Sequence, residues 1–483
     1  MKKIAIALII TLLLSFAPVV SGCKNNLARS SYDIEIALNE NVLTGKETVT
    51  FYNGGDNTVS QLKFNLFANA FRKGAKYNPI ADHYSVRAYP NGESFGGMQI
   101  LSVSSGGKQM QFEICGEDQN VLAVGLDEEV YPEEYVAVEI EFKVQLANVV
   151  ARTGINTKTI NLANFYPILC AYSGGGFYEC VYYDKGDPFF SDCADYNVKI
   201  TASKEYVVAS SGKLISSVAG ENAVTNEYQI GNARSFAFVL SKDYKVIEEN
   251  FNGVEIYYYY YADKEPEKSV EFIRRSLSLF NEKFGEYPYP TYTVTQTEFL
   301  QGGMEFPALV MISDDLDGLS YGEVIVHETA HQWWQTAVGN NEIEFGFLDE
   351  GLAEYSVVLF YENYPEYGYS RNQLIKSSED TYRVFCSVHD KLFGSVNTVM
   401  KRPLNKFNSE YEYVNMAYVK PCIMYDYLRT TIGDERFFTA LKKYYKNYKF
   451  LNVTPDDLVG TFEKVGADSN GFFESFFEGK VII

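Results

Sequence analysis

The stretch VIVHETAHQWW, residues 324–334, decides how the rest of this chain is interpreted. It contains two of the four histidines in 483 residues, His327 and His331, and Glu328 directly follows the first of them. Their i, i+4 spacing places both imidazoles on one face of a predicted helix, where they can bind one metal ion. The alternative is a helix with two core histidines, and it is disfavoured because histidine is so rare in this chain.

A third metal ligand is predicted further along the chain. Eighteen residues, 332–349, separate His331 from Glu350, which lies in the stretch FLDEGLAEY that we predict to be a second helix. Two imidazoles, one carboxylate and an open fourth position are typical of a catalytic zinc site rather than a structural one. Glu354 shares the helix face of Glu350 and is predicted to hydrogen-bond the far nitrogen of a ligand histidine. A solvated surface acid is the alternative for Glu354.

This combination resembles the gluzincin metallopeptidases, in particular the aminopeptidase N family that also includes leukotriene hydrolase. The similarity extends from about residue 31 to residue 480 and includes several further motifs. GGMEF (302–306) resembles the family's G-x-M-E-N exopeptidase motif, and AYVKP (417–421) resembles its tyrosine-containing element. HQWW (331–334) and LDEGLAEY (348–355) resemble the sequences around its metal ligands, and YDIEIALNENVLTGKETVTFYN (32–53) resembles its first β-hairpins.

The resemblance implies one Zn²⁺ per chain, bound by His327, His331 and Glu350. Glu328 is expected to act as general base and then as general acid. Tyr418 is expected to donate its hydroxyl to the oxyanion of the tetrahedral intermediate, and a plain core tyrosine is the alternative.

The motif around Glu305 implies recognition of a free N-terminus. Glu305 is expected to meet the α-ammonium group of a peptide, while Gly302, Gly303 and Met304 allow the backbone to approach the substrate closely. A solvated loop acid is the alternative for Glu305. Phe306 stands where the family has asparagine, so the polar contact of that asparagine is not expected here.

The hydrophobic pattern changes from strand-like to helical along the chain, and this change predicts two domains. Period-two alternation and Gly/Asn turns predict a β domain over residues 31–247, and helical patterns dominate after Pro266. The resemblance implies an α+β multidomain protein. An N-terminal antiparallel β-sandwich or saddle domain is followed by a thermolysin-like zinc catalytic domain, residues 248–483, with a small sheet lobe and a helical lobe. Many relatives have a further large C-terminal helical domain, which we do not expect here, so the cleft is expected to be more open or to be covered by a partner.

The N-terminus predicts export and lipidation. Lys2 and Lys3 precede an apolar run that ends at Ser21-Gly22-Cys23, which resembles a bacterial lipobox. We therefore expect a signal peptide over residues 1–22, a lipid anchor at Cys23, and a tether over 23–30. An ordinary secretory signal is the alternative. The expected location is the outer face of a bacterial cytoplasmic membrane, at the cell surface or in the periplasm.

Composition excludes some classes of partner and leaves other questions open. A formal net charge of −21 argues against nucleic-acid binding through a basic surface. The cysteines form no C-x-x-C pair, which disfavours zinc-finger and thioredoxin chemistry, and any disulfide pairing stays open.

His83 and His389 lie outside any motif and are predicted to be structural. Trp333 and Trp334 are expected to pack the helix. The sequence does not predict an oligomeric state.

The leading hypothesis is a zinc aminopeptidase that removes N-terminal residues from extracellular oligopeptides. A zinc endopeptidase with an open cleft is the first alternative, and it requires that Glu305 point away from the substrate. A non-catalytic peptide-binding lipoprotein is the second alternative. An intact ligand set with Glu328 and Tyr418 present argues against it. The sequence does not predict the preferred first residue.

Overall fold

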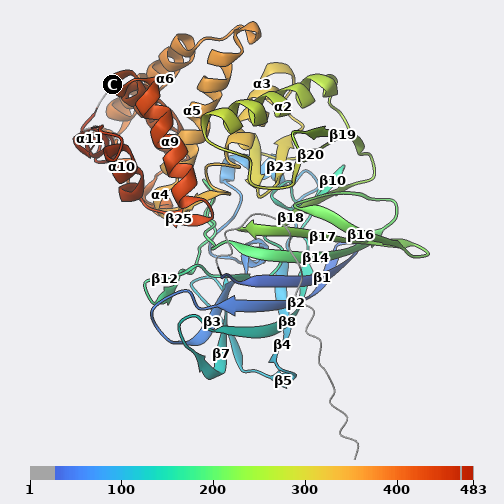
Figure 1. Cartoon of the computed structure of the whole chain (residues 1–483). Coiled ribbons are helices and arrows are strands. Elements are labelled where there is room, and N and C mark those ends of the chain that lie inside the picture. The colour runs from blue at the N-terminus through green and yellow to red at the C-terminus, as the bar shows by residue number, and fades with distance from the viewer. Residues whose placement is uncertain (1–27, 468–469, 482–483) are drawn as a thin grey trace, which may run out of the picture.

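The computed structural model describes residues 28–467 and 470–481, and the predicted signal peptide and Cys23 lie outside them. Strands dominate the first half of the described chain and helices the second (Figure 1). None of the helices in these residues is long and apolar enough to cross a membrane. The protein is thus of mixed α+β class, as predicted.

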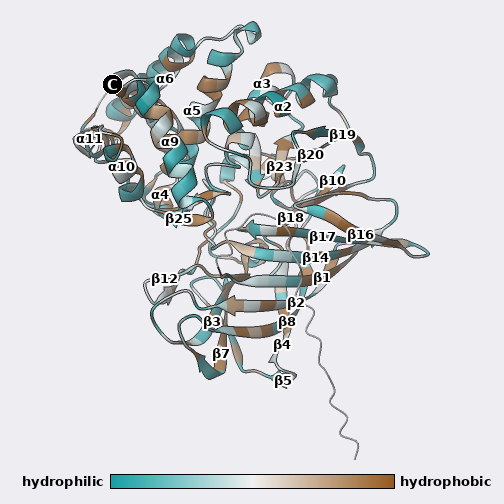
Figure 2. Ribbon diagram, viewed as in Figure 1, coloured by the Kyte–Doolittle hydropathy of each residue, from teal (hydrophilic) through white to brown (hydrophobic). Residues whose placement is uncertain are grey.

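The largest sheet has eight strands in the order β16-β17-β14-β1-β2-β8-β4-β5. Along β1, Tyr32, Ile34 and Ile36 are buried and the residues between them are exposed, which confirms the predicted alternation. Figure 2 shows bands of hydrophobic and hydrophilic residues along these strands. β1 pairs antiparallel with β2 but parallel with β14, so this sheet is not wholly antiparallel. The strands are β1 (Ser31–Asn39), β2 (Val42–Tyr52), β4 (Gly97–Ser105), β5 (Lys108–Gln109), β8 (Tyr135–Gln145), β14 (Ala194–Ser203), β16 (Lys213–Ala219) and β17 (Ala223–Ala233).

Two four-stranded sheets and a short hairpin complete this β-rich part. Their orders are β11-β3-β7-β6 and β15-β18-β10-β9, and the hairpin is β12-β13. Side chains from the large sheet and from β3 and β7 belong to one buried cluster, which continues into the helical part of the chain. The strands are β3 (Val59–Asn65), β6 (Phe112–Cys115), β7 (Val121–Val130), β9 (Thr153–Ile155), β10 (Thr159–Ala163), β11 (Ile168–Leu169), β12 (Tyr172–Ser173), β13 (Gly176–Phe177), β15 (Val207–Ser210) and β18 (Ala237–Ser241).

A five-stranded sheet, in the order β19-β20-β21-β23-β22, begins the second part of the chain. Its strands are β19 (Lys245–Phe251), β20 (Val254–Tyr260), β21 (Thr291–Thr297), β22 (Gly303–Phe306) and β23 (Leu309–Ser313). The predicted domain boundary between residues 247 and 248 falls inside β19, which pairs with β20 along its whole length. In the structure the second part therefore starts at β19.

A small parallel pair joins β24 (Val338–Asn340) to β25 (Leu451–Val453).

Helices cover this sheet and form the upper part of the molecule in Figure 1. The apolar face of α2 is buried, including Val270, Ile273 and Leu277. The helices are α1 (Ser85–Ala88), α2 (Pro266–Lys283), α3 (Gly318–Ala330), α4 (Glu342–Phe345), α5 (Phe347–Asn363), α6 (Arg371–Phe393), α7 (Glu410–Val414), α8 (Lys420–Ile432), α9 (Asp434–Tyr448), α10 (Pro455–Glu463) and α11 (Asn470–Phe477). Short 3₁₀ turns are η1 (Phe67–Phe71), η2 (Asp82–Tyr84), η3 (Pro365–Tyr367) and η4 (Leu404–Lys406), and a π-helical turn, η5 (Asn415–Val419), joins α7 to α8.

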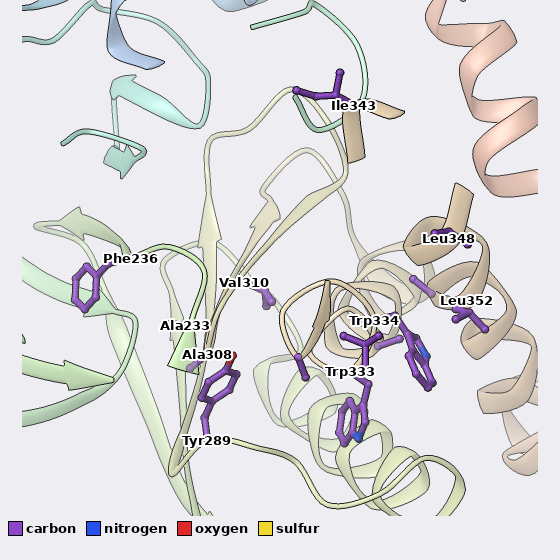
Figure 3. Close-up of a cluster of buried hydrophobic side chains, with 14 of the residues drawn as sticks. Ala233, Phe236, Tyr289, Ala308, Val310, Trp333, Trp334, Ile343, Leu348 and Leu352 are labelled. Carbon is purple, nitrogen blue, oxygen red and sulfur yellow. The ribbon is translucent and has the colours of Figure 1, made fainter. Parts of the chain in front are cut away.

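Trp333 and Trp334 anchor the C-terminal end of α3 in the core. Both lie in the buried hydrophobic cluster of Figure 3 and are almost fully buried. Both rings pack against Phe284, which directly follows α2. The indole Nε1 of Trp333 donates to the carbonyl oxygen of Gly285 at 2.7 Å. This confirms the prediction that the two tryptophans pack the helix, and it fixes the position of the histidine beside them.

Candidate metal centre and substrate pocket

Two packed helices position the three predicted metal ligands. His327 lies in the last turn of α3, His331 caps that helix, and Glu350 lies in the first turn of α5. The apolar residues Ile325 and Val326, just before His327, are fully buried and fix this face of α3. The three side chains therefore come from a rigid pair of helices rather than from loops.

The ligand atoms of this triad converge on one point. Nε2 of His327 and Nε2 of His331 are 3.1 Å apart, and Oε2 of Glu350 lies 3.3 Å and 3.1 Å from them. Zinc–ligand bonds of about 2.0–2.1 Å in a tetrahedral site place ligand atoms about 3.3 Å apart. The donor set and its spacing fit Zn²⁺.

The outer nitrogens of both histidines have their own acceptors. Nδ1 of His331 donates to the carbonyl oxygen of Trp334 at 3.0 Å, and Nδ1 of His327 lies 3.3 Å from Oε2 of Glu354. The contact predicted for Glu354 is thus present in the structure. These bonds favour the tautomer that leaves Nε2 unprotonated, which is the form that binds a metal. Burial lowers the pKa of His327, but the bonds to Glu350 and Glu354 outweigh burial and raise it to about 10.

Glu328 lies beside the triad, where a general base is required. Its side chain is 5% exposed, and burial raises its pKa to about 8. Within the described residues its Oε2 has no hydrogen-bond partner. A Cβ atom at Gly303 would lie 2.5 Å from Oε1 of Glu328. Gly303 therefore leaves space for this carboxylate, a role that the sequence had not indicated.

Tyr418 lies on the π-helical turn η5, and its hydroxyl donates to Oε1 of Glu350. Its ring is nearly parallel to that of His327, with the centroids 5.9 Å apart. π-Helical turns are frequent at functional sites because they shift the direction of one side chain relative to a regular helix. The predicted tyrosine therefore reaches the metal centre.

Glu305 lies on the edge strand β22, and it is 4% exposed. It lines a pocket of about 230 Å³ together with Gly302, Gly303, Glu328 and the metal-binding triad. The next residue, Phe306, is buried in an apolar cluster with Leu309 and Met311. Its side chain packs in the core, so the polar contact of the family's asparagine is replaced by apolar packing.

Asp187 and Arg152 belong to the same site and were not predicted. Asp187 lines the pocket and pairs with the buried guanidinium of Arg152, whose Nε also lies 2.9 Å from Sδ of Met304. Burial raises the pKa of Asp187 to about 7. The two residues lie in the β-rich part, far from every quoted motif. Nothing in the local sequence distinguishes them, and only the tertiary fold brings them to Glu305.

Residues 268–476 match the sequence family described as "Peptidase family M1 domain". Aminopeptidase B from Rattus norvegicus is 27% identical over 227 residues, which cover 42% of this chain and 33% of that protein. Probable aminopeptidase 1 from Saccharolobus solfataricus is 23% identical over 213 residues, 41% of this chain and 26% of that protein. The chain thus spans about a third or less of the length of these relatives.

Solved structures show the same fold over almost the whole chain. An M1 zinc metallopeptidase from Deinococcus radiodurans covers 95% of this chain, and 96% of that protein is covered in turn, with a TM-score of 0.64 at 16% identity. At 16% identity this likeness shows the fold alone. The evidence for a metal-dependent peptidase site comes from the family match and from the converging triad. The family match, the aminopeptidase relatives and the converging triad together indicate an M1-type peptidase domain over residues 268–476 with zinc as its cofactor.

Proposed function

We propose that this protein is a zinc-dependent aminopeptidase that removes N-terminal residues from oligopeptides. The observation that carries the proposal is a single pocket in which the triad His327, His331 and Glu350 lies next to Glu328 and Glu305. One such pocket can hold a metal, a base and an anchor for an amino group.

Zn²⁺, when bound, polarises the scissile carbonyl and acidifies water. Glu328 takes a proton from the attacking water and passes it to the leaving amine. The Tyr418 hydroxyl turns from Glu350 to the developing oxyanion, which it stabilises by hydrogen bonding. These roles are supported because Glu328 and Tyr418 line the same pocket as the metal-binding triad.

Glu305 makes the enzyme an exopeptidase in this proposal. Its carboxylate is buried, so a substrate without a positive N-terminus leaves it unpaired in a site of low solvent access. Asp187 adds a second carboxylate near it, with ligand oxygens of the two within 4.8 Å. A free α-ammonium group satisfies this environment and an acetylated terminus does not, which favours an aminopeptidase over an endopeptidase.

The substrates and location belong to the proposal as well. Solved M1 relatives bound to L-arginine and to a Tyr-Ser-Ala substrate support the binding of amino acids and short peptides. The lipobox-like residues 21–23 support export and an anchor at Cys23 on the outer face of a bacterial membrane. We infer that the substrates are extracellular oligopeptides.

The test uses the zinc-loaded full chain and peptide pairs that differ only in a free or acetylated N-terminus. We expect release of single residues from free termini, no cleavage of acetylated peptides, and loss of activity in Glu328→Gln with zinc retained. Glu305→Gln is expected to reduce the preference for free termini. Internal cleavage of acetylated peptides by the unaltered protein would instead establish the endopeptidase. Bound zinc without turnover of any peptide would favour the binding protein.

A further inference from the structure

Lys420 is a buried lysine that the proposed mechanism does not use. It lies at the start of α8, two residues after Tyr418, and its side chain is fully buried. Among the described residues no carboxylate forms an ion pair with it, and burial lowers its pKa to about 8. Burying an ammonium group without a carboxylate partner costs free energy, so a lysine at this position calls for a physical reason.

The ammonium group joins two segments that are distant in the sequence. Nζ of Lys420 donates to the carbonyl oxygen of Thr398, in the segment after α6, at 2.6 Å, and to that of Phe476, in α11, at 2.9 Å. The two segments also bond each other, since the amide of Met400 donates to the carbonyl oxygen of Phe477 at 3.0 Å. One buried side chain thus connects the start of α8 to α11 and to the segment after α6.

The helix beside Lys420 is interrupted where it carries Tyr418. α7, η5 and α8 follow one another without a gap, and Tyr418 lies on η5. Pro421 has no N–H and cannot donate to the carbonyl oxygen of Ala417, as the residue at this position of a regular α-helix does. Because the helical hydrogen bonding is broken here, contacts from outside the helix must help to hold η5 in place.

We propose that Lys420 is a positioning residue for Tyr418. By bonding the start of α8 to two other segments, it holds η5, and with it the Tyr418 hydroxyl, beside the metal-binding triad. Of the described residues, Tyr418 lines the substrate pocket and Lys420 does not, so Lys420 acts only through the backbone. This inference rests on the proposed function, in which Tyr418 stabilises the oxyanion. A misplacement of about 1 Å can cost about 100-fold in rate, so a small shift of η5 is enough.

The first experiment compares Lys420→Met with the unaltered, zinc-loaded full chain on a dipeptide substrate. Methionine keeps an unbranched side chain and removes the donors. We expect kcat to fall by about 10–100-fold with KM and zinc content unchanged, because only the placement of the Tyr418 hydroxyl changes. Lys442→Met is the matched control, since Lys442 is exposed on α9, and its kcat is expected to be unchanged. An unchanged kcat in folded Lys420→Met overturns the proposal.

A double variant separates positioning from a merely structural role. If Lys420 acts through the hydroxyl of Tyr418, Lys420→Met adds no further loss of kcat to Tyr418→Phe, because the group that it positions is already absent. If the two losses multiply instead, Lys420 supports the fold independently of Tyr418, and the proposal is overturned. Each kcat is referred to the amount of folded, zinc-loaded protein, so a lower yield of folded chain is not counted as slower chemistry.

A measurement without substrate separates this inference from the proposed function. Hydrogen–deuterium exchange of the backbone amides of η5 is expected to be faster in Lys420→Met than in the unaltered chain and in Lys442→Met, whether or not a peptide is cleaved. Equal exchange in all three overturns the positioning role. Absence of peptide hydrolysis by the unaltered chain, with faster exchange in Lys420→Met, overturns the proposed function alone.

A milder variant keeps the test decisive if Lys420→Met fails to fold. In Lys420→Gln the amide nitrogen lies one atom short of Nζ, so it cannot bond both carbonyl oxygens at the observed distances. We expect a smaller fall in kcat, faster exchange in η5, and again no further loss in the Tyr418→Phe background. Unchanged kcat together with unchanged exchange overturns the proposal.

Discussion

Two buried clusters meet at Glu305, and they differ in the neighbours of their carboxylates. In the first, burial favours protonation of Glu350, but His331 and His327 outweigh it and hold its pKa below the usual range. In the second, burial and the neighbours Asp349 and Glu305 all raise the pKa of Glu342. Both carboxylates are about 2% exposed. Burial alone therefore does not decide the charge of a buried acid; the sign of its neighbours does.

The difference also separates the chemistry of the two clusters. Imidazole nitrogens with one carboxylate suit zinc, whereas the second cluster, Asp187, Glu305 and Glu342, offers carboxylates without imidazole. The following changes alter one cluster while leaving the other in place, so each of them tests whether the two are independent.

The largest effect is expected from His331→Ala, which removes a ligand of the first cluster. We expect zinc content to fall well below one ion per chain and peptidase activity to fall by about a thousandfold or more, because metal catalysis contributes several kcal/mol. Metal analysis and peptide hydrolysis measure both. His389→Ala is the control, since His389 packs against Phe385 away from the site. Unchanged zinc content in His331→Ala would contradict the assignment of the triad.

Tyr418→Phe keeps both clusters and removes one hydroxyl. We expect kcat to fall by about 10²–10³-fold with little change in KM, as for other oxyanion donors. Zinc content is expected to be unchanged, because the hydroxyl contacts Glu350 without being a predicted ligand. Steady-state kinetics on a dipeptide substrate measure the effect, and Tyr411→Phe, at a 46% exposed residue, is the control. A loss confined to KM would place Tyr418 in substrate binding only.

Glu354→Gln changes a residue that contacts the ligand His327 without itself binding the metal. It replaces the acceptor of Nδ1 of His327 by an amide, and we expect zinc affinity to fall by about 10–100-fold. Competition with a chelator of known affinity measures this change. Glu323→Gln is the matched control, because Glu323 lines the same pocket. Equal zinc affinity in both variants would show that Glu354 is a solvated acid without effect on the metal.

The smallest effect is expected from Glu342→Gln in the chain freed of zinc. Because the folded pKa of Glu342 lies above the unfolded value, its contribution to stability is present at low pH and is lost as pH rises between these two values. Glutamine does not titrate. The variant is therefore expected to match the unaltered chain near about pH 4 and to be about 1–2 kcal/mol more stable near about pH 7.

Urea unfolding at both pH values measures this difference. A difference that is the same at both pH values would show that the pKa of Glu342 is the same in the folded and unfolded chains.

The first cluster could be predicted from the sequence and the second could not, for a physical reason. His327 and His331 are positioned by helical spacing, which local sequence encodes directly, and Glu350 lies in a motif that resembles the family's third ligand. Asp187, Arg152 and Glu342 come from segments that meet only in the folded chain, and none lies in a recognisable motif. The predicted boundary between residues 247 and 248 divides strand β19, whose alternating pattern continues that of the β-rich part. The π-helical turn before α8 has no sequence signal either.

The parallel pairing of β1 with β14 bears on how the molecule folds. Ser31 pairs with Asp195, so the first strand to be made must wait for a neighbour more than 160 residues later. Such non-local pairing slows folding, because a long loop must close before the contact forms. Until then the β1–β2 hairpin exposes an open edge that can pair with other chains. A chain that ends before β14 is complete therefore carries an aggregation-prone edge at the centre of its unfinished sheet.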